Sequence, residues 1–232
     1  MASLIAIEGR TYPAVDALDN TEMNLLQRQV LNRNGEISYG NTFLQDLFQD
    51  HAGLIHAACR VAKEMLGNIA YRGMMAGDNE LGVSLIRPCM VKRTTGGTET
   101  PSGDWTFSFA AGSDYWLGFG TDNTTALNID KRLLVVPMAV WWSQGGAPVV
   151  EELQFRVGQN VYPYQVIRHG WIADNQNRVR AARIRPMIWA PKDTVLSQVS
   201  SLVANDQEMV LVGLAFAKGD YLSTRLPTSV QT

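Results

Sequence analysis

The three histidines are the side chains best suited to acid–base or metal chemistry near neutral pH. His51 and His56 fall on one helical segment, but a spacing of five residues places them on different faces. The H-E-x-x-H pattern of zinc enzymes is absent. His169 ends a predicted strand, with no cysteine or acidic cluster near it in the sequence. We therefore expect structural roles for all three histidines, with no metal site and no cofactor.

The remaining patterns that carry catalysis are also missing. The glycine-rich stretches TTGGTETPSG and SQGGAP match neither a P-loop nor a dinucleotide fingerprint, and no G-x-S-x-G nucleophile motif occurs. Glu151 and Glu152 are adjacent on a predicted strand and so point to opposite faces. A hydrolase of the sandwich type would need such carboxylates, together with Asp104, Asp114 or Asp122, on one concave face. The sequence predicts no enzyme and no catalytic residue.

Four arginines lie close together in NRVRAARIRP. Arg178 and Arg180 share one strand parity and Arg183 and Arg185 the other, so a bulge at residues 181–182 could bring all four together. Such a cluster could contact a phosphate or form ion pairs between subunits. We favour a solvated edge strand protected by its charges.

Six tryptophans raise the alternative of a carbohydrate platform. Trp105 and Trp116 lie at predicted core positions. Trp141 and Trp142 are adjacent on a strand, so one should enter the core and the other should emerge on a face. This pattern favours a filled core and subunit contacts over sugar binding.

Before residue 80 the hydrophobic period is helical. A first helix should begin at Thr21 as N-cap and stop at Asn34-Gly35, and a second should run from Thr42, which has a capping-box pattern, to about Ala70. Ile55 lies on the apolar stripe of the second helix and Lys63 on another face. We therefore expect Ile55→Asp to be destabilising and Lys63→Asp to be tolerated.

From about residue 81 the period becomes two. Eight strands are expected, near 82–93, 104–110, 114–119, 131–143, 149–157, 160–169, 179–190 and 207–218, and a further one in TVLSQVSSLVA. The runs LLVVPMAVWW and EMVLVGLAFA are apolar on both faces, as in strands that are covered twice. Pro137 lacks an amide hydrogen, so its strand should lie at a sheet edge or bend there through a bulge.

Composition limits the function further. Apolar residues make up 46% of the chain and charged residues 18%, with a net charge of −2, which argues against a phosphate-neutralising nucleic-acid binder. Cys59 and Cys89 are expected to be buried free thiols in a reducing compartment. The N-terminal stretch shows no secretory signal, no run is long enough to span a membrane, and Asn123-Thr124-Thr125 should be a polar turn.

Two units follow from the change of period: an N-terminal arm with two helices over 1–80 and an antiparallel β-sandwich over 81–232. The stretch RPMIWAPKDTVLSQVSSLVANDQEMVLVGLAFAKGDYL resembles the closing strands of viral and phage capsid or capsid-associated proteins with a single jelly roll. The resemblance is architectural and covers the strands of residues 81–222. It implies a mainly β, jelly-roll sandwich that assembles into capsomers and a shell without catalysis or cofactor.

The sequence thus predicts a virion structural protein, made in the host cytoplasm, whose partners are copies of itself and other virion proteins. It predicts no small-molecule substrate and no sequence-specific nucleic acid. The alternative is a glycan-binding sandwich module of a host-recognition protein. If the N-terminal arm clamps a neighbouring subunit, deleting residues 1–40 should weaken assembly and leave the sandwich folded.

Overall fold

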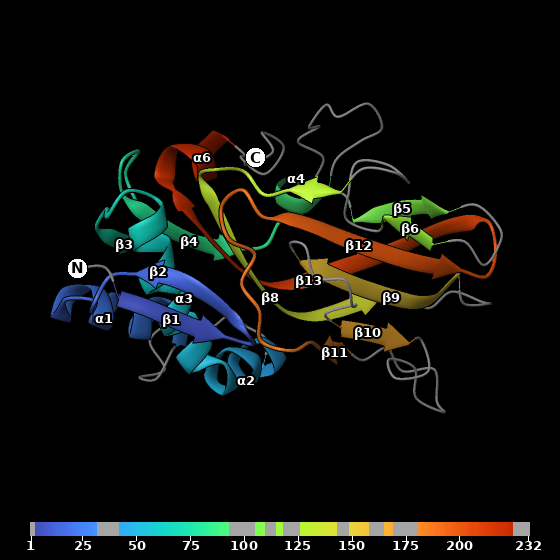
Figure 1. The fold of residues 1–232 in the computed structure, drawn as a ribbon, viewed down its shortest axis with the longest axis horizontal. Coiled ribbons are helices and arrows are strands. Elements are labelled where there is room, and N and C mark those ends of the chain that lie inside the picture. Colours follow the sequence, from blue (N-terminus) through green and yellow to red (C-terminus); the bar gives the residue numbers. More distant parts are fainter. Residues whose placement is uncertain are drawn as a thin grey trace.

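The computed structural model describes residues 3–31, 42–92, 105–109, 115–117, 126–142, 149–157, 165–168 and 181–224, and every structural statement below concerns these residues. The fold is mainly β (Figure 1). The strands are β1 (Ser3–Ile7), β2 (Arg10–Ala14), β3 (Tyr71–Gly73), β4 (Leu81–Leu85), β5 (Thr106–Phe109), β6 (Tyr115–Leu117), β7 (Leu127–Asn128), β8 (Leu133–Trp142), β9 (Val150–Val157), β10 (Gln165–Arg168), β11 (Ala182–Arg183), β12 (Thr194–Ser201) and β13 (Asn205–Lys218). The helices are α1 (Asn20–Leu26), a π-helical turn η1 (Gln27–Leu31), α2 (Thr42–Asp50), α3 (Ala52–Met65), α4 (Pro88–Val91) and α6 (Gly219–Thr224).

The strands form two large sheets and one hairpin. The five-stranded sheet has the order β10-β9-β12-β6, with β7 also on β12, and the six-stranded sheet has the order β11-β8-β13-β4-β3, with β5 also on β13. β1 and β2 pair only with each other among the described strands. Every described pair is antiparallel except β3 with β4. The absence of β-α-β units agrees with the predicted antiparallel architecture.

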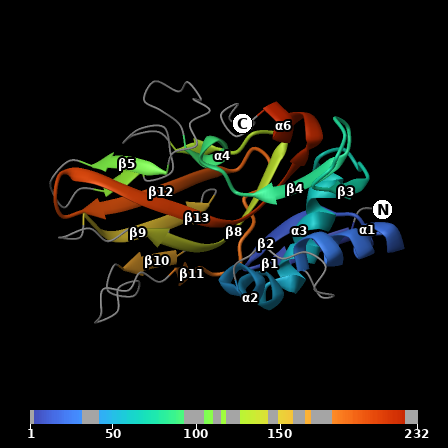
Figure 2. The ribbon, with the colours of Figure 1, turned by 180° about the vertical axis from the view of Figure 1, so that it is seen from behind.

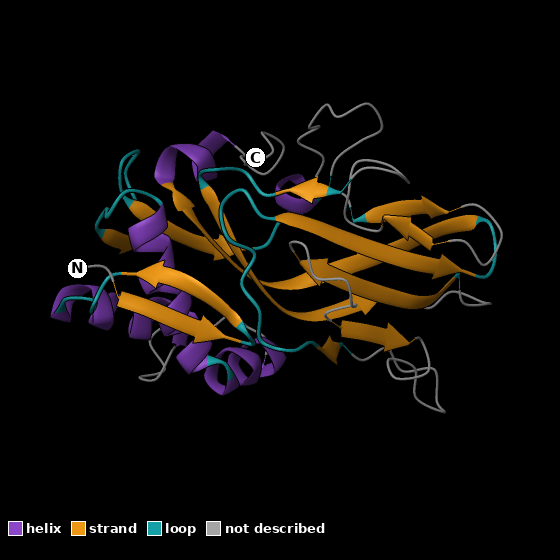
Figure 3. Ribbon diagram, viewed as in Figure 1, coloured by secondary structure: helices purple, strands orange, loops and turns teal. Residues whose placement is uncertain are grey.

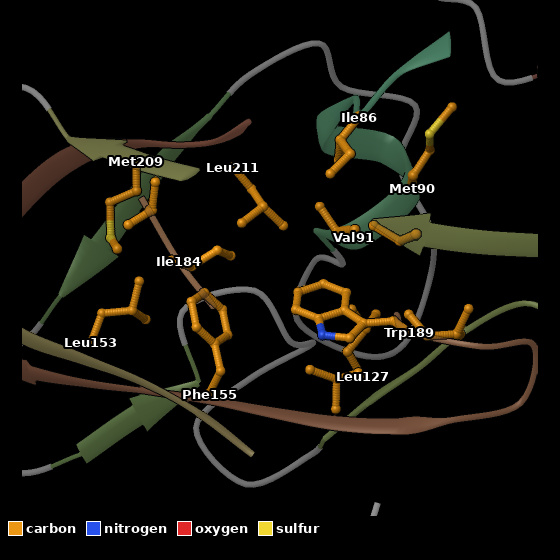
Figure 4. Packing of buried hydrophobic residues seen from close by; sticks show 14 of the residues in the cluster. Ile86, Met90, Val91, Leu127, Leu153, Phe155, Ile184, Trp189, Met209 and Leu211 are labelled. Atoms are coloured by element: carbon orange, nitrogen blue, oxygen red, sulfur yellow. The ribbon is translucent and has the colours of Figure 1, made fainter. Parts of the chain in front are cut away.

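One hydrophobic core lies between the two large sheets (Figure 4). Leu153 and Phe155 of β9 meet Met209 and Leu211 of β13 there, and the Phe155 ring packs against Trp189 at 5.7 Å between centroids. All five residues are buried almost completely. Facing sheets with one shared core are consistent with the predicted β-sandwich.

A second core covers the opposite face of the six-stranded sheet. Its sheet residues come from β4, β8 and β13, and the other side is supplied by the β1–β2 hairpin and by α1, η1, α2 and α3. These helices gather at one end of the molecule (Figures 2 and 3). The prediction that β8 and β13 are covered on both faces is confirmed, and the cover comes from the N-terminal part of the same chain.

A bulge in β8 decides which face each side chain of this strand meets. Opposite it, Val212 pairs with Ala139 but Gly213 pairs with Pro137, so Met138 is the extra residue. Before the bulge, even-numbered residues of β8 face the helices; after it, odd-numbered residues do. Pro137 therefore lies in a central strand, at a bulge, which is one of the two arrangements predicted for it.

The N-terminal elements differ from the prediction in three respects. Asp19, not Thr21, is the N-cap of α1, and its carboxylate accepts a hydrogen bond from the Glu22 amide at 2.8 Å in a capping box. The segment from Thr42 is divided into α2 and α3 at His51, and α3 ends at Met65 rather than near Ala70. The β1–β2 hairpin was not predicted, because SLIAI and RTYPA are short and the two-residue turn between them, in which Glu8 and Gly9 both have positive φ, has glutamate where Asn or Asp is the usual signal.

The strand predictions also need corrections. The strand expected over 82–93 ends at Leu85 and is followed by α4, in which Pro88 occupies the first turn, where its missing amide hydrogen costs nothing. The strand expected over 179–190 consists of β11 and one isolated bridge between Val135 and Trp189. The additional strand in TVLSQVSSLVA is confirmed as β12, the centre of its sheet.

A buried ion pair fastens the N-terminal helices together. Glu22 is only 2% exposed, and its carboxylate accepts hydrogen bonds from Lys63 Nζ at 2.8 and 2.9 Å and from the Tyr71 amide at 3.0 Å. Three segments distant in sequence therefore meet at one carboxylate. Lys63 lies off the apolar stripe, as predicted, but its ammonium pairs with a buried carboxylate, so the structure favours the opposite expectation for Lys63→Asp, namely destabilisation.

Candidate binding surface

The helices cover only part of the outer face of the six-stranded sheet. They lie over residues 134–139 of β8, 214–216 of β13 and 81–83 of β4. Further along the same strands, Trp141, Val210, Val212 and Leu85 line a groove of about 720 Å³. We call this the Trp141 groove. Its other walls are Phe43 and Leu44 of α2, together with Ile86, Trp105, Ala181, Leu211 and Gly213.

The β8 bulge brings Trp141 into this groove. Without the extra residue Met138, Trp141 would share the parity of Val135 and would face the core between the sheets. With it, Trp142 is fully buried in that core, whereas Trp141 is half-buried on the opposite face. The sequence predicted one tryptophan inside and one outside, and the bulge determines which is which.

Gly213 forms part of the floor of the groove. A Cβ atom at this position would lie 2.1 Å from the carbonyl oxygen of Val136, so only glycine lets β13 approach β8 at the bulge. Because residue 213 has no side chain, the backbone itself lines this part of the groove, next to Val212.

The eleven described residues that line the groove are all apolar, and three of them are aromatic. None of these eleven side chains can act as a general acid, a base or a metal ligand. Arg183 of β11 and Asp50 of α2, on two of the elements that border the groove, form an ion pair with each other. The groove can bury apolar groups, and its size lies within the range of binding pockets for small molecules or a few side chains.

The histidines do not contribute to the groove. His51 lies at the break between α2 and α3, and its Nδ1 donates a hydrogen bond to the Leu47 carbonyl oxygen at 2.8 Å. His56 lies on α3, where burial and the charge of Arg60 lower the pKa of its imidazole. His169 lies outside the described residues. No group of three His, Cys, Asp or Glu in the described part of the chain could hold a metal ion.

The predicted carboxylate pair is divided by a second bulge. Ser200 pairs with Glu152 but Ser201 pairs with Val150, which leaves Glu151 as the extra residue of β9. Glu151 is exposed, whereas Glu152 accepts hydrogen bonds from Gln154 Nε2 at 2.6 Å and from Arg168 Nε at 3.3 Å. The two carboxylates therefore have different environments. Glu151 has the same odd-numbered position in the strand alternation as the buried Leu153 and Phe155, and the bulge explains why it is nevertheless exposed. Asp104, Asp114 and Asp122 lie outside the described residues.

Two of the four arginines of the basic stretch, Arg183 and Arg185, lie in the described part of the chain. Arg183 lies on β11, which pairs only with β8 among the described strands, and its guanidinium forms the ion pair with Asp50. Arg185 is exposed. Arg178 and Arg180 lie outside the described residues, so the predicted joining of all four by a bulge is not tested.

Four of the six tryptophan side chains are described, and two of these are buried and two half-buried. Trp142 and Trp189 are fully buried, and Trp105 is half-buried at the margin of the core, where it also lines the Trp141 groove. The Trp116 side chain is not described. Because Trp142 is inaccessible, the two adjacent tryptophans cannot form a paired sugar platform.

Both cysteines are buried free thiols, as predicted. Burial, and to a smaller degree the charge of Glu22, raises the pKa of the Cys59 thiol far above its usual range. A thiol that stays protonated is a poor nucleophile and a poor metal ligand. Cys59 is therefore a packing residue of the second core.

No helix of the described chain is both long enough and apolar enough to cross a membrane. Comparisons with models of known protein families, with curated proteins and with solved structures find no match.

Proposed function

We propose that the two large sheets form a jelly roll and that the protein is a structural component of a virion shell, which assembles through lateral contacts between copies. The nested pairing of the strands carries the proposal. β8 and β13 pair in the six-stranded sheet, while β9 and β12, which lie between them in the chain, pair in the five-stranded sheet. This is the pattern of a long antiparallel ribbon folded over onto itself, as in a jelly roll.

The flanking strands support the same topology. β4 and β5 pair with β13 on its side away from β8, and β6 and β7 pair with β12 on its side away from β9. β11 and β10 occupy the far edges next to β8 and β9. The chain thus supplies eight successive strand positions that exchange between two four-position sheets, which is the order of two Greek keys.

The Trp141 groove supports assembly as the role of this fold. The N-terminal helices hide one end of the six-stranded sheet. The remaining apolar surface is concentrated in the groove and in a few exposed side chains, among them Leu4, Met74 and Met75. Concentrated apolar surface marks contacts with other proteins.

The glycan-binding alternative has less support. Jelly rolls also occur in lectins, but the burial of Trp142 leaves Trp141 as the one stacking surface of the pair, and none of the described residues that line its groove has a charged or amide side chain. Sugar recognition needs polar groups that fix the hydroxyls. Binding in a glycan array that is lost in Trp141→Ala, by a chain that does not assemble, would reverse this preference.

Self-assembly is tested on the purified chain. Mass photometry over a range of concentrations, followed by negative-stain microscopy, should show rings, capsomers or closed particles whose fraction rises steeply with concentration. Steepness is expected because each lateral contact is weak and many act together. A chain that stays monomeric at every concentration and in high-salt buffer would overturn the proposed function.

A further inference from the structure

Two neighbouring methionines protrude from the turn that follows β3. Met75 is 88% exposed and Met74 58% exposed, which makes them the most exposed adjacent pair of large apolar residues in the described chain. Single exposed apolar side chains are common on proteins, but an adjacent pair at a protruding turn is a feature of contact surfaces. We call residues 73–80 the methionine turn.

The backbone of the methionine turn is fixed on both sides. The Glu80 carboxylate accepts hydrogen bonds from the Gly77 amide at 2.9 Å and from Arg72 Nε at 3.1 Å, and the Gly219 amide donates to the Glu80 carbonyl oxygen at 3.1 Å. A Cβ atom on Gly219 would lie 2.3 Å from the Gly77 carbonyl oxygen. Side chains presented from a fixed backbone lose less conformational entropy on binding.

The chemistry of the turn matches that of the Trp141 groove. Thioethers make favourable contacts with aromatic rings, and Phe43, Trp105 and Trp141 supply three rings to the groove. Charge is compatible with the contact as well. None of the described residues that line the groove is charged, and Arg72 and Glu80 neutralise each other beside the methionines. Asp78, the remaining charged residue of the turn, is exposed and lies three residues beyond Met75, so insertion of the two methionines buries no unpaired charge as long as Asp78 stays in solvent.

We propose that the methionine turn of one copy inserts into the Trp141 groove of a second copy. The inference rests on the proposed self-assembly and names the surfaces that make one of its contacts. Neither Met74 nor Met75 lines the groove of its own chain. Because the turn and the groove are different surfaces, the contact is head-to-tail, and such contacts close into rings or continue into larger arrays.

The size of the contact favours a second copy over a foreign partner. The groove, of about 720 Å³, has room for a few side chains, whereas a stable isolated complex uses about 20–30 residues on each side and about 800 Å² per partner. One insertion of two side chains cannot hold a single partner firmly. Repeated around a ring or shell, the same contact is reinforced by every neighbouring contact.

A charge swap tests the contact. Met75→Lys and Leu85→Glu each change an exposed position, since Leu85 is 40% exposed on the groove wall, so the fold should remain intact by circular dichroism and urea unfolding. Each single variant should lower the assembled fraction at least tenfold, because it places an unpaired charge in an apolar contact. The double variant should recover much of the assembly, because the introduced ammonium of one copy then meets the introduced carboxylate of the next.

The matched control is Leu202→Lys, at an exposed apolar residue of the turn between β12 and β13, which should assemble like the wild type. Peroxide footprinting gives an independent measurement: oxidation of Met74 and Met75 to sulfoxide should slow in assembled wild-type protein. Met23 and Met65, which are half-buried, serve as internal references.

The outcomes separate this inference from the proposed function. If the wild type assembles and the single variants assemble equally well, the insertion is wrong and self-assembly stands. If the single variants fail and the double variant also fails, the turn and the groove do not meet each other, and the inference is again wrong. If the wild type does not assemble at all, the proposed function and this inference fall together.

Discussion

The carboxylate of Glu22 shows how one residue can organise a whole region. It accepts a hydrogen bond from the amide of Asp19, the N-cap of α1, at 3.0 Å and another from the Tyr71 amide at the start of β3. It also forms an ion pair with Lys63 of α3. Lys63 is itself only 16% exposed, so the ion pair is shielded from solvent. In such surroundings a charge that loses its partner is costly, because it can be neither hydrated nor compensated.

We therefore expect Lys63→Ala to lower the free energy of unfolding by about 3 kcal/mol or more. Lys63→Asp should be worse, because it places a second carboxylate beside Glu22, and its loss should approach that of Ile55→Asp in the second core. Urea unfolding followed by tryptophan fluorescence measures the change. Lys131→Ala, at an exposed lysine, is the control and should stay within about 0.5 kcal/mol of the wild type. An unchanged midpoint for Lys63→Ala would contradict the role given to the ion pair.

Residue-level predictions from the sequence held where they depended on local pattern. The burial of Cys59 and Cys89 followed from their apolar neighbours. The spacing of Asp19 and Glu22 also fits a capping box, but the prediction placed the N-cap at Thr21 instead of Asp19. The ion pair could not be foreseen, because Glu22 and Lys63 are 41 residues apart and lie on different helices.

At the scale of elements, β8 and β13 form the most extensive strand pair of the molecule, and the bulge within it sets the two faces of the sheet. Gly213 lies opposite the bulge, where an added Cβ atom would be 2.1 Å from the Val136 carbonyl oxygen. Its Cβ contact would be with a backbone carbonyl of a central strand, which cannot move aside without disturbing the neighbouring pairs. Gly53, in contrast, has open space around its Cβ position on α3.

These two glycines give opposite predictions for the same substitution. Gly213→Ala should lower the free energy of unfolding by about 1–3 kcal/mol, the range typical of overpacking. Gly53→Ala should raise it by about 0.5 kcal/mol, because alanine favours the helical backbone. Thermal unfolding of the two variants, recorded under identical conditions, provides the comparison. Equal effects of the two variants would show that β8 and β13 leave room for a Cβ atom at residue 213, contrary to the structure.

Element types were predictable where the hydrophobic period persisted. The alternation in β9 and the doubly apolar runs of β8 and β13 identified these strands. The hydrophobic period gave the wrong element where tertiary contacts determine the structure. The apolar run that includes Pro88–Val91 predicts a strand but forms the buried helix α4. The apolar stripe continues past His51, yet the helix is divided there. Short elements such as the β1–β2 hairpin carry too few residues for any period.

At the scale of the whole molecule, the candidate binding surface could not be predicted from the sequence. The Trp141 groove draws its walls from residues 43 to 213, and its shape depends on where the helices stop covering the sheet. Only the kinds of side chain were predictable from the sequence: one of the two adjacent tryptophans should emerge on a face of the sheet, and the chain is rich in apolar residues. Which face Trp141 occupies depends on the bulge, and the register of a bulge is set by the partner strand.

The N-terminal part was expected to act as a removable clamp, and the structure assigns it a different role in stability. Leu26, Val30 and Tyr12 are buried in the second core, and the Arg10 guanidinium pairs with both oxygens of Asp193 at 2.7 and 2.9 Å. Removal of this region would expose the apolar residues of β4, β8 and β13 beneath it. The N-terminal residues thus belong to the folded unit of the strands.

Deletion of residues 1–40 should accordingly unfold or aggregate the chain, instead of weakening assembly alone. The expected result is loss of the cooperative urea transition, together with binding of an apolar dye, because the helix-facing side of the sheet becomes accessible. A shorter deletion of residues 1–2 leaves every described contact in place and is the control. A folded, cooperative sandwich that fails only in assembly would instead restore the clamp and would mean that the N-terminal helices can leave their own sheet to bind that of a neighbour.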